Sequence, residues 1–158
     1  PSDYYYLHAL KILLGQSDIN FVYGGGAGNM PKVGTILQGW GCEVMYLYDN
    51  DRAFKSAQTN IAREWITITK DILAKLNVDG SIEDLFSKQD FAELIVEVEP
   101  ATIVGKNSAF MANRDKVLPA KKFLEKCRSN SSLKLSTVSM ENSKQLFEVF
   151  EKVFGKYA

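Results

Sequence analysis

The chain has 158 residues, 46% of them hydrophobic and 24% charged, a composition typical of one folded domain and not of a disordered segment. Its 19 basic residues balance 19 acidic ones, which excludes an overall charge that would draw the chain to nucleic acid or to a membrane. The longest apolar runs are far shorter than the roughly 20 residues that span a bilayer, so no membrane partner is expected.

The first third of the chain alternates between helical and strand patterns. A helix is expected where leucines recur at helical spacing after Ser2, and another where Pro31 precedes a second apolar stripe. Between and after them lie short apolar runs typical of buried strands. The predicted order is helix, strand, glycine loop, helix and strand, at residues 3–14, 20–23, 24–29, 31–40 and 43–48. Such alternation predicts a parallel sheet with helices on its faces.

The rest of the chain is expected to be mainly helical. Residues 65–76 combine strand propensity with a helical pattern, and both interpretations stay open. Helices are predicted over 51–63, 87–96, from Pro119 through residue 127, and around 146–153. No repeat or linker divides the sequence, so residues 1–158 are interpreted as one α/β domain.

Charge is unevenly distributed along the chain. Residues 79–99 hold seven acidic residues and one basic residue, whereas residues 106–134 hold eight basic residues and two acidic ones. One interpretation is two solvated helix faces. The other assigns the acidic residues to a metal site and the basic ones to a phosphate backbone.

Two aspartates directly follow the strand predicted at residues 43–48. Asp49 and Asp51 would point to the same side of an extended chain, at the sheet edge where ligands of α/β proteins gather. Carboxylates this close repel each other unless a cation or a proton lies between them, and Mg²⁺ suits such oxygens. The alternative is an acidic turn that caps the helix beginning near Arg52.

The remaining polar motifs are less specific. Ser81 and Glu83 would share one side of an extended segment, or they belong to a capping box that starts a helix. The glycine loop at 24–29 matches neither a dinucleotide fingerprint nor a P-loop. His8 is the single histidine, so a catalytic site built on histidine is not expected. Cys42 and Cys127 match neither a disulfide framework nor a zinc site, which favours a reducing compartment.

Four segments taken together resemble the TOPRIM domain of OLD (overcoming lysogenization defect) family nucleases. They are residues 2–7 (SDYYYL), 23–29 (YGGGAGN), 47–51 (LYDND) and 81–86 (SIEDLF). The resemblance implies a Rossmann-like parallel sheet flanked by helices. In that family an ATPase domain precedes the TOPRIM domain, so the chain is expected to be the C-terminal part of a longer protein. The Glu-Gly pair that ends the family's first strand would lie before Pro1, and that strand is missing from the chain.

The resemblance also implies roles for individual residues. The implied metal ligands are Asp49, Asp51, Asp3, Glu83 and Ser81, the last two as the family's Ser-x-Glu element. Lys116 best matches a late lysine of the family, where a fixed cation would stabilise charge on the scissile phosphate. Lys121 and Lys122 match that lysine less well, and with Arg114 they are expected to contact the DNA backbone.

The implied function is a DNA endonuclease that hydrolyses phosphodiester bonds with two Mg²⁺ or Mn²⁺ ions. Its expected setting is a bacterial cytoplasm, with phage defence or DNA maintenance as its role. The expected partners are DNA and the ATPase domain of the parent protein. ATP would bind only to that separate domain. A homodimer is also considered. With one expected ligand missing, the chain alone is expected to bind metal weakly and cleave poorly. The alternative is a non-catalytic scaffold that binds nucleic acid or a protein.

Overall fold

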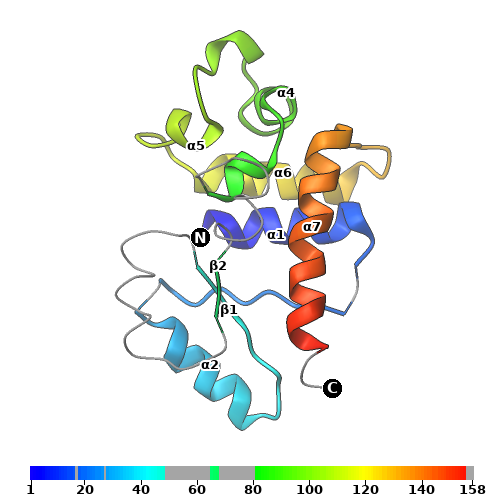
Figure 1. Cartoon of the computed structure of the whole chain (residues 1–158). Helices are drawn as coiled ribbons and strands as arrows, with labels where there is room; N and C mark the ends of the chain where they lie inside the picture. Colours follow the sequence, from blue (N-terminus) through cyan, green and yellow to red (C-terminus); the bar gives the residue numbers. More distant parts are fainter. Residues whose placement is uncertain (17, 27, 49–64, 68–80, 156–158) are drawn as a thin grey trace. The chain divides into compact units, whose positions relative to one another are not determined.

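The computed structural model describes residues 1–16, 18–26, 28–48, 65–67 and 81–155 (Figure 1). Asp49, Asp51, the helix predicted over 51–63 and residues 68–76 of the ambiguous segment lie outside these ranges. The chain divides into two compact units, one of residues 1–22 and 82–144, the other of residues 23–81 and 145–158. None of the described helices is long and apolar enough to cross a membrane.

The first unit is helical throughout its described elements. They are α1 (Ser2–Leu14), the 3₁₀ helix η1 (Ile82–Leu85), α4 (Lys88–Asp90), the π-helix η2 (Phe91–Val96), the 3₁₀ helix η3 (Pro100–Thr102), α5 (Asn107–Phe110) and α6 (Val117–Ser129). The two long helices α1 and α6 lie side by side (Figure 1). Helix α1 ends at Gly15, whose positive φ of 65° lets its N–H reach back to the carbonyl groups of Lys11 and Ile12.

Aromatic and aliphatic side chains form the core of the first unit. Tyr6 and Leu10 of α1 are fully buried, as are Leu85 of η1, Phe91 of η2 and Phe123 of α6. Because Tyr6 and Leu10 are four residues apart, α1 turns one apolar face inward. The last helix, α7 (Thr137–Phe154), contributes residues to both units.

The second unit contains helix α2 (Met30–Gly39) and a short parallel pair of strands. Strands β1 (Tyr46–Tyr48) and β2 (Trp65–Thr67) pair in register, with Tyr46 opposite Trp65 and Tyr48 opposite Thr67. Both tyrosines are buried, and Met30 and Val44 pack against them. Gly34 permits the close approach of α2, because a Cβ atom there would lie 1.9 Å from the Tyr46 hydroxyl oxygen.

The predicted fold class was wrong. A Rossmann-like TOPRIM sheet flanked by helices was expected, whereas the described residues are mostly helical and their strands are two segments of three residues each. Residues 20–23 are not a strand, and Val22 and Tyr23 are 57% and 49% exposed. The strand predicted over 43–48 is reduced to its last three residues. The helices predicted over residues 3–14 and 31–40 are confirmed, since they match α1 and α2 to within one residue at each end.

Candidate metal centre

Three of the residues predicted to form a site come together in the first unit. Asp3 lies in the first turn of α1, Glu83 in η1, and Lys116 directly before α6. The Lys116 ammonium nitrogen is 3.3 Å from a carboxylate oxygen of Glu83. Both Glu83 and Lys116 also act on the pKa of Asp3. Three elements that are far apart in the sequence thus place their charged groups in one location.

Glu83 is held in place by a buried asparagine on the short helix α5. The Asn107 side-chain amide donates hydrogen bonds to the carbonyl oxygens of Glu83 and Phe86, both at 2.9 Å. The next residue, Ser108, donates its backbone N–H to the Asp84 carboxylate at 3.0 Å. Ser81 is half-buried and directly precedes η1. Because Glu83 lies in this 3₁₀ helix, the prediction that Ser81 and Glu83 share one side of an extended segment was wrong.

An aromatic cluster accompanies the three charged groups. Tyr6, Phe86 and Phe123 are all buried, with ring centroids 5.5 Å apart for Tyr6–Phe86 and Phe86–Phe123, and 6.4 Å apart for Tyr6–Phe123. Each ring is close in sequence to one of the charged residues. Asp3 and Tyr6 both lie on α1. Phe86 directly follows η1, which contains Glu83, and Lys116 directly precedes α6, which contains Phe123. The charged groups therefore lie beside a surface of low polarity.

Burial changes the pKa of Asp3. Desolvation is the main cause that raises the pKa of Asp3, and the negative charge of Glu83 raises it further, while Lys116 lowers it. Glu83 is 1% exposed, whereas the Lys116 side chain is 37% exposed. The partly exposed Lys116 therefore lies near both carboxylates, and the N-terminal ammonium group and the Ser2 hydroxyl group also lower the pKa of Asp3.

Asp3 and Glu83 carry the type of ligand that a hard divalent cation takes. Carboxylate oxygens are the ligands that Mg²⁺ and Mn²⁺ prefer, and a cation would relieve the repulsion between Asp3 and Glu83. The hydroxyl oxygen of Tyr6 is buried and has no hydrogen-bond partner among the described residues, so the site also holds an unused donor. Among the described residues, no group of three or more His, Cys, Asp or Glu side chains could hold a metal ion. Asp3 and Glu83 would thus supply only part of a coordination shell, and Asp49 and Asp51 lie outside the described residues.

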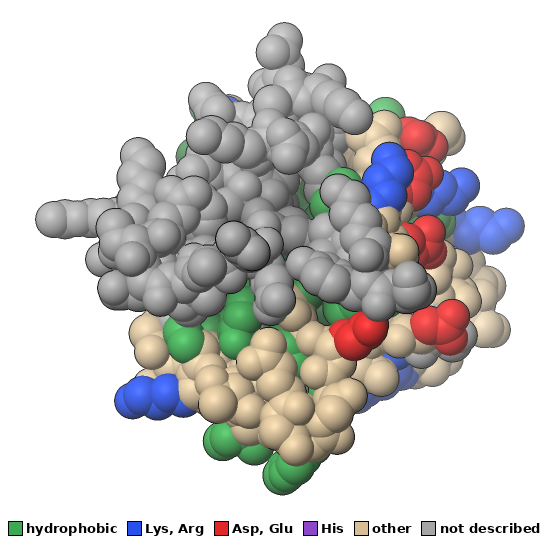
Figure 2. All heavy atoms as spheres, turned by 60° about the horizontal axis from the view of Figure 1, so that its bottom comes forward, with side chains coloured by type: hydrophobic (Ala, Val, Ile, Leu, Met, Phe, Trp, Pro, Cys, Tyr) green, Lys and Arg blue, Asp and Glu red, His purple; other side chains and the backbone are tan. Residues whose placement is uncertain are grey.

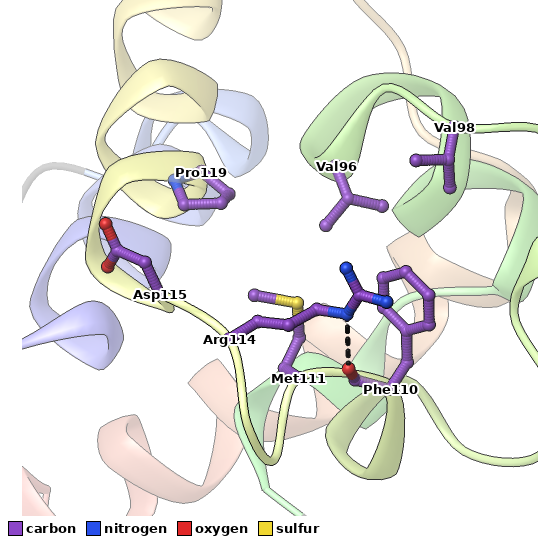
Figure 3. A pocket seen from close by; sticks show the side chains of 7 residues that line it. All are labelled: Val96, Val98, Phe110, Met111, Arg114, Asp115 and Pro119. Carbon is purple, nitrogen blue, oxygen red and sulfur yellow. Dashed lines mark hydrogen bonds between the residues drawn. The ribbon is translucent and has the colours of Figure 1, made fainter.

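The predicted DNA contacts lie near the start of α6. Lys121 and Lys122 are exposed on that helix. The Arg114 guanidinium carbon lies 4.2 Å from the centre of the Phe110 ring, and its Nε donates to the Phe110 carbonyl oxygen at 3.1 Å (Figure 3). Arg114 and Phe110 line a pocket of about 210 Å³. The other residues that line it are Val96, Val98, Met111, Asp115 and Pro119.

Basic and acidic side chains are neighbours on part of the surface. On the face shown in Figure 2, Asp and Glu side chains lie beside Lys and Arg side chains. A second ion pair, of 2.6 Å, joins Lys126 to Glu97. This pair and Lys116–Glu83 both connect the acidic segment 79–99 with the basic segment 106–134. Lys116 and Lys126 are therefore paired with acidic residues, whereas Lys121 and Lys122 are exposed.

Sequence reasoning missed three residues of this region. The spacing of Asp3 and Tyr6 on one helix face was a signal that could have identified Tyr6. No signal marked Asn107, because its role depends on the packing of α5 against η1. Asp115 was assigned no role, although its carboxylate accepts the N–H groups of Val117 and Leu118 at 2.8 and 3.4 Å and so caps α6. Comparisons with protein-family models, with curated proteins and with solved structures found no match to this chain.

Proposed function

We propose that the chain is the nuclease part of a divalent-metal-dependent DNA endonuclease of the OLD family. The observation that supports the proposal is the convergence of Asp3, Glu83 and Lys116, the residues to which the sequence resemblance assigns roles in the site. Carboxylates beside a fixed lysine suit phosphoryl transfer, because negative charge develops on the phosphate and its leaving oxygen.

Each residue would have a distinct part in the reaction. Asp3 and Glu83 would hold Mg²⁺ or Mn²⁺, with Asp49, Asp51 and Ser81 proposed as further ligands. A divalent cation, when bound, supplies charge neutralisation and an activated water. Lys116 would contact the scissile phosphate and stabilise its negative charge, since the Lys116 side chain is partly exposed whereas that of Glu83 is buried. Lys121, Lys122 and Arg114 would orient the DNA backbone.

The wider setting is proposed on the same basis. The chain would act on DNA inside a bacterial cytoplasm, next to the ATPase domain of its parent protein, in phage defence or DNA maintenance. ATP would bind to that other domain. A pair of such chains is one arrangement in which both DNA strands would be cut.

The test is cleavage of supercoiled plasmid by the full chain in Mn²⁺ or Mg²⁺, with EDTA as the metal-free control. We expect slow conversion to nicked plasmid, and we expect Glu83→Gln and Asp3→Asn to lower this rate by at least about 100-fold, because removing a group that stabilises the transition state costs several kcal/mol. Glu93→Gln is the matched control, since Glu93 is exposed on η2. Cleavage that continues at the parent rate in both site variants would overturn the proposal.

One observation favours the alternative, a non-catalytic scaffold. Lys116 already pairs with Glu83, and such a pair can serve the fold alone. A scaffold predicts that Mn²⁺ does not raise the unfolding temperature of the chain, whereas a metal centre predicts a rise that depends on Mn²⁺ concentration. Asp3→Asn should abolish that rise only if the centre exists.

A further inference from the structure

Tyr6 places a buried hydroxyl group beside the candidate metal centre. The residue is 0% exposed, and its ring packs against Phe86 and Phe123. Its hydroxyl oxygen has no hydrogen-bond partner among the described residues. Burying a hydroxyl group without a partner costs free energy that a phenylalanine at the same position would avoid. Packing therefore explains the ring of Tyr6 but not its oxygen.

Two carboxylates lie near the Tyr6 phenol. Burial is the main cause that raises the pKa of the Tyr6 phenol, and the carboxylates of Glu83 and Asp3 raise it further. Asp3 lies one helical turn before Tyr6 on α1, and Phe86, which the ring contacts, lies one turn after Glu83. The phenol is thus close to both proposed metal ligands, one on its own helix and one on η1.

We propose that Tyr6 is a positioning residue of the metal centre, whose hydroxyl group donates a hydrogen bond to an oxygen that accompanies the bound cation. That oxygen belongs either to a water molecule or to a phosphate group, since both present a lone pair polarised by the metal. The inference rests on the proposed metal centre. Tyr6 would orient this oxygen without binding the cation itself, because a protonated phenol is a hydrogen-bond donor and a poor ligand for hard cations.

The experiment measures Mn²⁺ binding by isothermal titration to the full chain and to Tyr6→Phe, without DNA and without any activity readout. We expect the dissociation constant to rise about tenfold in Tyr6→Phe, the effect typical of removing a hydrogen bond that supports a metal site. In EDTA we expect the variant to unfold at the same temperature as the parent or higher, because an unsatisfied buried hydroxyl group has been removed. Tyr4→Phe is the matched control, since Tyr4 lies on the same helix and packs against His8.

A second titration, with inorganic phosphate present, distinguishes the two sources of the oxygen. An effect with Mn²⁺ alone indicates water, and an effect that needs phosphate indicates the phosphate group. Equal dissociation constants for parent and Tyr6→Phe in both titrations would overturn the inference, as would a lower unfolding temperature in EDTA with unchanged Mn²⁺ binding. Asp3→Asn separates this failure from that of the proposed function. If Asp3→Asn leaves Mn²⁺ binding unchanged, the metal centre itself is wrong.

Discussion

The ammonium group of Lys116 lies 3.3 Å from the carboxylate of Glu83, and the pair joins the most basic segment of the chain to the most acidic one. Lys126 and Glu97 make the same connection at 2.6 Å, and Lys126 also donates to the carbonyl oxygen of Leu94. These two ion pairs connect η1 and the end of η2 with α6 and the residue before it. Glu83 differs from Glu97 because it is buried beside a second carboxylate.

The Lys116–Glu83 pair predicts a specific pattern of stabilities. Lys116→Met leaves Glu83 buried next to Asp3 without a cation, so the free energy of unfolding should fall by about 1–3 kcal/mol, less than for a fully buried pair because Lys116 is partly exposed. Adding Glu83→Gln removes the uncompensated charge and should restore part of the loss. Urea unfolding in EDTA at pH 7 measures both, with exposed Lys121→Met as the control. Additive effects of the two substitutions would show that the pair contributes nothing.

The sequence predicted helices well because a helix satisfies its backbone hydrogen bonds locally. The spacing of Leu7, Leu10 and Leu14 is sufficient to identify α1. A strand depends on pairing with another strand elsewhere in the chain, and residues 20–23 are not a strand in the structure. Contacts between distant segments also limited the prediction of the site. Asp3, Glu83 and Lys116 were selected by resemblance, while the contribution of Asn107 exists only after α5 has packed on η1.

The close contact between α2 and β1 predicts that Gly34 cannot be replaced. In Gly34→Ala the new methyl group would lie 1.9 Å from the Tyr46 hydroxyl oxygen and 2.5 Å from its ring, so the helix or the ring must move. We expect a loss of about 1–3 kcal/mol in the free energy of unfolding, despite the higher helix propensity of alanine. Gly39→Ala is the matched control, because a Cβ atom there meets nothing within 4 Å. Equal effects at the two glycines would contradict the packing described for Tyr46.

A buried aspartate connects α4 to the start of α7. One oxygen of Asp90 accepts hydrogen bonds from the Ser136 N–H at 3.0 Å, from the Ser136 hydroxyl group at 2.6 Å and from the Ser139 hydroxyl group. Asp90→Asn replaces part of this acceptor with a donor and removes the charge. The free energy of unfolding should therefore fall by about 2 kcal/mol, as for other hydrogen bonds to charged groups. Thermal unfolding of Glu93→Gln, an exposed acid nearby, should match the parent within about 0.5 kcal/mol.

The two cysteines should differ in reactivity because only one is buried. Cys127 is 4% exposed and burial raises the pKa of its thiol from 9.0 to about 11, whereas Cys42 is exposed. In Cys42→Ser, a disulfide reagent at pH 8 should label Cys127 only after urea unfolds the chain. Between pH 9 and 11 the folded chain keeps a proton that the unfolded chain loses, so stability should decrease as pH rises, and Cys127→Ala should lack this contribution. Rapid labelling of folded Cys42→Ser would contradict the packing of Cys127 in α6.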